Sequence, residues 1–200
     1  MSQVDYALVD FAAAHAGRRV LDLGCGLGGY SRALQERGFE VLAFDVEPAY
    51  VERARALGVR AETYDGERLP LAEAAVDTVL LFEVIEHLDD HAPILREARR
   101  VAADGVLVST PNCTQRFEGV PLEFSHMLDL DHRQFFTEES LRALLENVFG
   151  SCVVEQVAPL DHMIAGLVLP APLRPLYRLL HRAGRVRPRY YSRLLGRAPA

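Results

Sequence analysis

The chain has 200 residues, which is enough for one domain with a sizeable hydrophobic core. Half of the residues are hydrophobic and 25% are charged, a composition typical of globular proteins that excludes a low-complexity chain. The net charge is -6, so the chain is poorly suited to nucleic acid, and we expect no nucleic-acid partner. No secretory signal follows Met1 and the cysteines form no CxxC pair, so we expect a cytoplasmic protein with reduced thiols.

Apolar, β-branched runs alternate with longer amphipathic stretches along the chain, as in a βαβ fold. Pro48 begins a predicted helix that Gly58 ends, and Thr137 caps another helix further on. We therefore predict an α/β fold with a mostly parallel sheet and flanking helices. Its predicted strands lie at residues 20–23, 41–44, 76–82, 105–109 and 152–157.

A long stretch of weak periodicity lies between Thr110 and Thr137, after the carboxyl end of a predicted strand. Long loops in compact domains are usually lids or binding loops, and ligands of open α/β sheets bind at this edge. We expect residues 110–137 to cover the substrate. His126 and His132 in this cover either pack within the loop or transfer protons.

The glycine-rich motif VLDLGCGLGG occupies residues 20–29, between a predicted strand and a helix. Gly24, Gly26 and Gly28 allow the backbone to approach a ligand closely. The alternative set of Gly24, Gly26 and Gly29 fits a dinucleotide site. The glycines alone therefore leave an NAD-dependent oxidoreductase open.

Two aspartates bear on the choice of cofactor. Asp45 lies at the distance from the glycines that is typical of a residue binding ribose hydroxyls. Asp22, two residues before the first glycine, would repel a pyrophosphate but attract the ammonium and sulfonium of S-adenosylmethionine. Because Asp45 also fits a dinucleotide site, it is Asp22 that favours S-adenosylmethionine as the cofactor.

Four further motifs follow along the chain, namely FDVEP, YDGERLPL, LLFEVIEHL and VSTPN. With these motifs in this order, the chain resembles class I S-adenosylmethionine-dependent methyltransferases from about residue 18 to about residue 157. The resemblance implies that Asp45 binds the ribose, that Asp65 and Gly66 contact the adenine, and that Phe82 and Glu83 lie near the methyl group. It also implies a Rossmann-like, doubly wound sheet of seven strands with an antiparallel edge strand. We expect a single methyltransferase domain over residues 1–200, with its cofactor-binding core at residues 1–158.

Glu83, Glu86 and His87 would share one face if their segment is helical. In methyltransferases resembling the ubiquinone-pathway enzymes, the histidine lies near the acceptor and could take its proton. In the small-RNA 3'-end methyltransferases, the same residues and a later histidine, here His132, bind a divalent metal. We favour His87 and His132 as catalytic residues without a metal. Glu86 could instead be solvated or cap a helix.

The C-terminal segment is strongly basic, since eight arginines lie after Asp161 and no acid does. We assign residues 160–187 to an apolar and basic helical insertion, and residues 188–200 to a closing strand and tail. Leu173, Leu176, Leu179 and Leu180 alternate with Arg174, Arg178 and Arg182, which predicts a basic amphipathic helix. Such a helix could lie on an anionic membrane, or its leucines could pack on the sheet or on a second subunit in a homodimer.

The sequence thus predicts O-methylation of a small or of a lipid- or glycan-linked acceptor by in-line displacement. It predicts a cytoplasmic enzyme with peripheral contact to the membrane. Two alternatives stay open: an inactive methyltransferase-like binding module at a membrane surface, and the NAD-dependent oxidoreductase.

Overall fold

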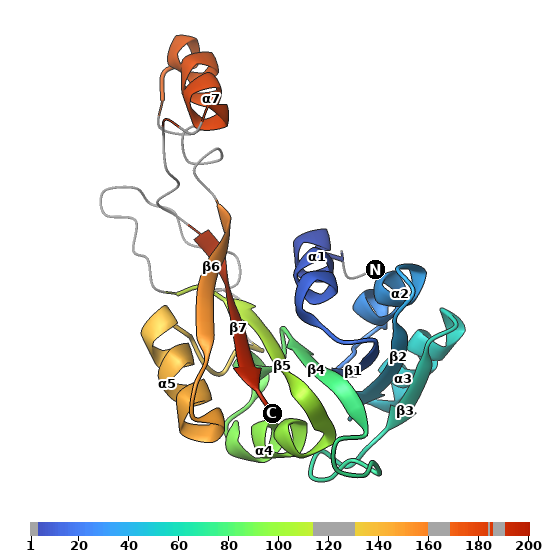
Figure 1. The fold of residues 1–200 in the computed structure, drawn as a ribbon. Coiled ribbons are helices and arrows are strands. Elements are labelled where there is room, and N and C mark those ends of the chain that lie inside the picture. The colour runs from blue at the N-terminus through green and yellow to red at the C-terminus, as the bar shows by residue number, and fades with distance from the viewer. Residues whose placement is uncertain (1–3, 114–130, 160–168, 184, 186–190) are drawn as a thin grey trace.

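A computed structural model describes residues 4–113, 131–159, 169–183, 185 and 191–200. Seven strands form one sheet in the order β3-β2-β1-β4-β5-β7-β6 (Figure 1). The strands are β1 (Arg19–Leu23), β2 (Glu40–Asp45), β3 (Arg60–Thr63), β4 (Val76–Phe82), β5 (Ala102–Pro111), β6 (Val153–Pro159) and β7 (Tyr191–Pro199).

The strands from β3 to β5 are parallel, and β7 runs antiparallel to both β5 and β6. The predicted mostly parallel, seven-stranded sheet is therefore confirmed. Strand β7 is the second strand from the edge of the sheet and lies between β5 and β6. Strand β3 has no counterpart in the predicted elements, because Ala61 is its only buried residue and its remaining side chains are polar.

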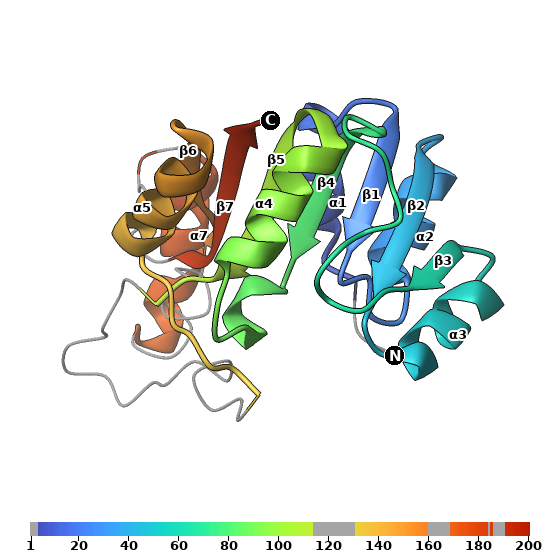
Figure 2. The same cartoon turned by 90° about the horizontal axis from the view of Figure 1, so that it is seen from below.

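Helices cover both faces of the sheet, as in a doubly wound fold (Figure 2). One face carries α1 (Tyr6–His15), α2 (Gly29–Glu36) and α3 (Pro48–Ala56), and the other carries α4 (Ala92–Val101) and α5 (Glu138–Phe149). Neighbouring strand residues point to opposite faces. In β1, Val20 therefore packs in the cluster under α1 and α2, while Leu21 packs in the larger cluster under α4 and α5.

The predicted helix ends are confirmed at both positions where the sequence gives a clear signal. Pro48 is the first residue of α3, and Gly58 follows its end with a φ of +81°. Thr137 caps α5 by accepting from the Ser140 backbone N–H at 3.1 Å. The Ser140 hydroxyl accepts in return from the Thr137 backbone N–H at 2.9 Å, which completes a capping box.

The C-terminal segment contains a short 3₁₀ turn, η3 (Ala171–Leu173), followed by α7 (Arg174–Arg182). Figure 1 shows α7 apart from the sheet. Its Leu176 and Leu179 are exposed, so they do not pack on the sheet as one alternative held. No helix in the described part of the chain has the length and apolar character needed to cross a bilayer.

Candidate active site

The glycine-rich motif forms a tight turn between β1 and α2. Gly24, Gly26 and Gly28 all have positive φ, at +81°, +51° and +80°. A Cβ on Gly24 would lie 2.6 Å from Val84 Cγ2, whereas a Cβ on Gly26 would meet nothing within 4 Å. Open space therefore lies beside Gly26, where a ligand can reach the backbone.

Gly28 has a different surrounding from Gly26. A Cβ at Gly28 would lie 2.7 Å from the Ala54 Cβ and 2.9 Å from its Cα. The absence of a side chain here lets α3 pack against the turn. A cavity beside the turn is lined by Gly29 but not by Gly28.

A cavity of about 420 Å³, here called the glycine-turn cavity, opens beside this turn. It is lined by Val4, Gly24, Cys25, Gly26, Leu27, Gly29, Tyr30, Tyr50, Phe82, Glu83 and Arg193. Four of the predicted cofactor residues thus come together, namely Gly24, Gly26, Phe82 and Glu83. Its size suits a small organic ligand.

Asp45 supports the turn from the end of β2. Its Oδ2 accepts from the Gly26 backbone N–H at 2.8 Å and its Oδ1 from the Glu47 backbone N–H at 3.0 Å. The side chain is buried. Asp45 therefore fixes the conformation of the glycine turn, whatever it contacts in addition.

Asp22 lies beneath the turn and does not line the cavity. Its Oδ2 accepts from the Ser31 hydroxyl at 2.5 Å, which links β1 to α2. The pKa of Asp22 is raised to about 6, chiefly by burial, which outweighs the lowering effect of the Ser31 hydrogen bond, while the nearby Asp45 adds a smaller increase.

Asp65 and Gly66 form a separate exposed turn after β3. Asp65 Oδ1 accepts from the backbone N–H of Glu67 at 2.8 Å and of Arg68 at 3.0 Å. These hydrogen bonds hold the pKa of Asp65 below its usual value. Neither Asp65 nor Gly66 lines the glycine-turn cavity, so their predicted contact with adenine stays a prediction.

The EVIEH segment does not form the helical face that its spacing would give. Glu83 has a φ of +56°, which is strained for a residue with a side chain, and a 3₁₀ turn, η1 (Ile85–His87), begins only after it. Glu83 Oε1 accepts from the Ser109 hydroxyl at 2.8 Å, and its other oxygen pairs with Arg193. Glu83 lines the glycine-turn cavity, whereas Glu86 and His87 do not line it.

His87 and His132 come from segments far apart in the sequence, and their rings lie 4.8 Å apart between centroids. The backbone N–H groups of Arg133 and Gln134 donate to the Glu86 carbonyl at 2.8 and 3.0 Å, which joins the two segments. His87 Nδ1 lies 3.1 Å from the Asp131 carbonyl oxygen. Because a carbonyl can only accept, Nδ1 is the donor, and in the neutral form of the ring Nε2 carries the lone pair.

Glu86 completes this group, which we call the histidine cluster. One ligand atom from each of Glu86, His87 and His132 lies within 4.8 Å of the others, a set that could hold a metal ion. Glu86 is 1% exposed, and its Oε2 has no hydrogen-bond partner among the described residues. Burial, followed by the proximity of Glu83, raises the pKa of Glu86.

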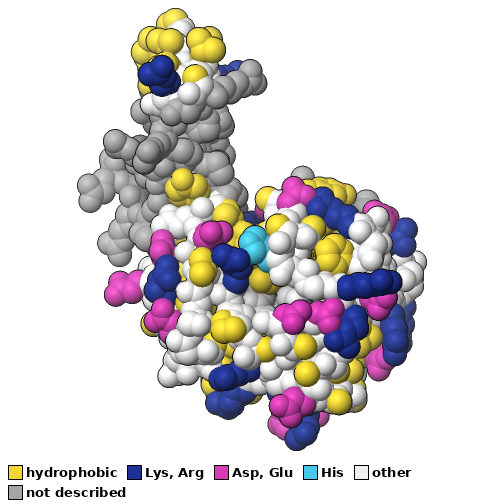
Figure 3. All heavy atoms as spheres, viewed as in Figure 1, with side chains coloured by type: hydrophobic (Ala, Val, Ile, Leu, Met, Phe, Trp, Pro, Cys, Tyr) yellow, Lys and Arg dark blue, Asp and Glu magenta, His cyan; other side chains and the backbone are white. Residues whose placement is uncertain are grey.

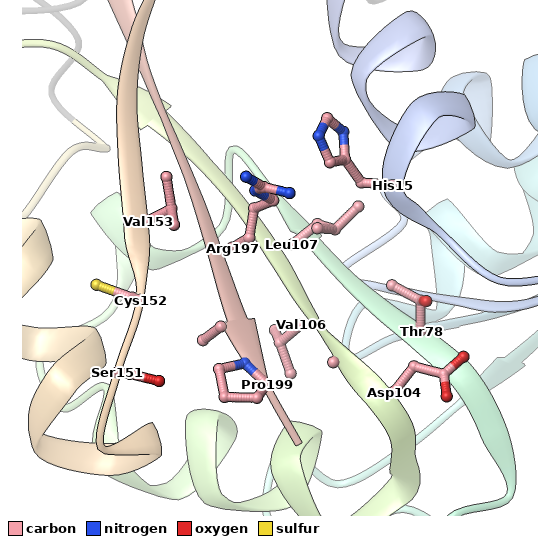
Figure 4. A pocket seen from close by; sticks show the side chains of 12 residues that line it. His15, Thr78, Asp104, Val106, Leu107, Ser151, Cys152, Val153, Arg197 and Pro199 are labelled. Atoms are coloured by element: carbon pink, nitrogen blue, oxygen red, sulfur yellow. The ribbon is translucent and has the colours of Figure 1, made fainter.

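His126 and most of the predicted substrate cover lie outside the described residues. A second cavity of about 400 Å³ lies over β5 and β7, with Arg197 and His15 at two of its sides (Figure 4). Among the described residues, it shares no lining residue with the glycine-turn cavity.

The residues that fit S-adenosylmethionine are those of the glycine-turn cavity. The space beside Gly26 would be filled by a side chain there, as expected where a ligand contacts the backbone. Tyr30 and Phe82 offer aromatic surface, with their rings 5.6 Å apart, and Glu83 offers a negative charge for a cationic ligand.

Sequence reasoning did not identify Arg193, Tyr30 or Tyr50 as part of this cavity. Arg193 lies in an arginine-rich segment far from the glycine motif, and no spacing connects the two. Tyr30 directly follows the glycines, so the expectation that α2 begins there could have identified it.

Comparisons with known proteins identify the family of the chain. The model of the methyltransferase domain family matches residues 4–148. A probable S-adenosylmethionine-dependent methyltransferase of Mycolicibacterium smegmatis is 34% identical over 167 residues, covering 80% of this chain and 65% of that protein. A ubiquinone biosynthesis O-methyltransferase of Hahella chejuensis is 35% identical over 104 residues, covering 48% of this chain and 44% of that protein.

Among solved structures, a SAM-dependent methyltransferase from Archaeoglobus fulgidus superposes with a TM-score of 0.70 at 18% identity. The alignment covers 98% of this chain and 94% of that one, which supports the same fold. The chain spans only 65% and 44% of the length of the two curated relatives above. On the family match, this chain belongs to the methyltransferase domain family, and its structure has the Rossmann-like fold of the solved SAM-dependent methyltransferase.

Proposed function

We propose that the protein methylates an oxygen atom of a small or of a lipid- or glycan-linked acceptor. The observation that carries this proposal is the histidine cluster, whose Glu86 and His87 follow Glu83 of the glycine-turn cavity by three and four residues along the chain. The similarity to the ubiquinone biosynthesis O-methyltransferase of Hahella chejuensis supports oxygen as the target.

S-adenosylmethionine would supply a methyl group on a cationic sulfur, which is already activated for in-line displacement. The protein then has to align the acceptor oxygen and remove its proton. His87 suits the second task, because its Nδ1 is held by the Asp131 carbonyl and its Nε2 can accept a proton. His132, whose ring is packed against it, is the second candidate.

The test is methyl transfer to a panel of phenols, catechols and prenylated or glycosylated alcohols, followed as acceptor-dependent formation of S-adenosylhomocysteine. We expect His87→Ala to lower turnover by roughly 100-fold, the usual contribution of a general base, with cofactor affinity unchanged. His15→Ala is the matched control, since His15 lies at the other cavity. Full turnover by His87→Ala would remove His87 as the base.

The histidine cluster also supports a metal-assisted form of the same reaction. The buried Glu86 Oε2, which has no hydrogen-bond partner within the described residues, and the lone pair of His87 Nε2 suit a divalent cation. A cation held by Glu86, His87 and His132 would bind the acceptor oxygen and favour its deprotonation. Calorimetry with Mg²⁺, Mn²⁺ and Zn²⁺ would detect it. Binding that His132→Ala abolishes would favour this form, and no binding would favour the metal-free one.

We further propose that α7 holds the protein at an anionic membrane, where a lipid-linked acceptor would lie. Leu173, Leu176, Leu179 and Leu180 are 47%, 53%, 64% and 37% exposed. Arginines accompany them, and Figure 3 shows hydrophobic and basic side chains together at the end of the molecule formed by α7. An exposed apolar face beside arginines suits anionic lipid.

Co-sedimentation with phosphatidylglycerol vesicles and with phosphatidylcholine vesicles tests this proposal. We expect binding to the anionic vesicles alone, and its loss in the double variant Leu176→Ser, Leu179→Ser. Leu57→Ser is the control, because Leu57 is 48% exposed elsewhere on the surface. If the wild type binds neither vesicle and instead forms a dimer that the double variant breaks, α7 is a subunit interface.

A further inference from the structure

The glycine-turn cavity has two charged side chains in its described lining, Glu83 and Arg193. They form an ion pair with each other. The cavity therefore presents a carboxylate and a guanidinium side by side, next to the open backbone of Gly26.

Arg193 is brought there by the last strand. It lies near the start of β7, where its register partner on β5 is Pro111, at the end of that strand. It is outside residues 4–148, which the family model matches. The position of Arg193 is thus a consequence of how β7 enters the sheet between β5 and β6.

Arg193 is also held by Asp5, which lies just before α1. Its Nε donates to Asp5 Oδ2 at 3.1 Å, and Asp5 Oδ1 in turn caps α1 by accepting from the Ala7 backbone N–H at 3.0 Å. The Arg193 side chain is 25% exposed. Its Nη2 has no hydrogen-bond partner among the residues described, so the guanidinium has donors to spare.

The methionine part of S-adenosylmethionine ends in an α-ammonium and an α-carboxylate, which are charges of opposite sign on one carbon. A carboxylate that enters a partly buried site loses water and needs donors in return. The Glu83–Arg193 pair matches this arrangement, because each charge of the ligand finds an opposite charge. Among the described lining residues, Arg193 is the side chain that carries a positive charge.

We propose that Arg193 binds the α-carboxylate of the cofactor, with Glu83 next to it facing the α-ammonium. This inference rests on the proposed use of S-adenosylmethionine and names a residue that supports its binding. It makes the C-terminal strand, which follows the arginine-rich segment, part of the cofactor site.

The experiment compares two cofactors that differ only in this carboxylate, S-adenosylmethionine and decarboxylated S-adenosylmethionine. Calorimetry would give the affinity of the wild type and of Arg193→Met for each. We expect the wild type to bind S-adenosylmethionine roughly 10- to 100-fold more tightly, the range for one charge-assisted hydrogen-bonded contact. Arg193→Met should lose this preference while binding the decarboxylated compound as the wild type does.

Arg197→Met is the matched control, since Arg197 lies on the same strand but lines the other cavity. It should keep the preference. Arg193→Lys keeps the charge with a single donor group and should show an intermediate preference for S-adenosylmethionine. This variant also tests the proposal if Arg193→Met does not fold.

Two results would overturn the assignment of Arg193. In one, Arg193→Met lowers the affinity for both compounds equally, which would mean that Arg193 only shapes the cavity. In the other, the wild type binds both compounds equally, so that the carboxylate is not recognised. If the wild type binds neither compound, the proposed cofactor itself is wrong, and that outcome is distinct from the first two.

Discussion

Replacing single glycines of the turn separates a residue that receives a ligand from one that permits packing. Gly26 and Gly28 both have positive φ, so alanine at either position is strained by about 1 kcal/mol. A Cβ at Gly26 meets nothing within 4 Å, but a Cβ at Gly28 would lie 2.7 Å from the Ala54 Cβ. Overpacking of this kind adds about 1–3 kcal/mol.

We therefore expect Gly28→Ala to lower the free energy of unfolding by about 2–4 kcal/mol and Gly26→Ala by about 1 kcal/mol. Urea denaturation of the two variants and the wild type measures this difference. Calorimetry with S-adenosylmethionine completes the comparison, because the Cβ of Gly26→Ala projects into open space beside the cavity. We expect this variant to lose cofactor affinity although it is the more stable of the two.

The reasoning would be refuted if Gly28→Ala were as stable as Gly26→Ala, since the close approach of α3 would then carry no cost. It would also be refuted if Gly26→Ala bound the cofactor as tightly as the wild type. The open space beside Gly26 would then have no role in binding.

Three other changes test neighbouring parts of the structure. Thr137→Ala removes the cap of α5 and should cost about 1 kcal/mol in urea denaturation, while an unchanged midpoint would show that the cap is dispensable. Asp45→Ala removes the acceptor of the Gly26 N–H and should lower cofactor affinity by roughly 10- to 100-fold in calorimetry; an affinity like that of the wild type would contradict its role. The pKa of Asp22 is about 6 in the folded protein, against an ordinary value of 3.8. Folding therefore favours its protonated form, so Asp22 contributes stability below pH 3.8 and loses this contribution as the pH rises through about 6. Relative to Asp22→Asn, the wild type should gain about 2 kcal/mol between pH 7 and pH 4, and a flat difference would argue against a buried carboxyl.

Most of the fold was predictable from local patterns, because buried strands and capped helices leave clear signals. The strand before the glycines, the start of α3 at Pro48 and the cap of α5 at Thr137 are examples. Strand β3 was not predictable, because its stability comes from pairing with β2 rather than from its own burial.

The cofactor site was predictable only in part. Gly24 and Gly26 follow β1 and Asp45 ends β2, and because these strands are adjacent and parallel, their carboxyl ends bring the three residues together. The helical spacing of Glu83, Glu86 and His87 was misleading, because Glu83 adopts a left-handed conformation and the 3₁₀ turn that holds Glu86 and His87 begins only at Ile85. Local patterns do not reveal such a conformation, which the surrounding contacts impose.

The sequence by itself determined the α/β fold, the family and the glycine turn, since each depends on residues that are neighbours in the chain or on adjacent strands. Only the tertiary structure decided which side chains meet across the cavity. His132 reaches His87 because the backbone of Arg133 bonds to Glu86. Arg193 reaches Glu83 because β7 inserts between β5 and β6. Contacts across such long separations are set by the order of the strands, which local sequence does not encode.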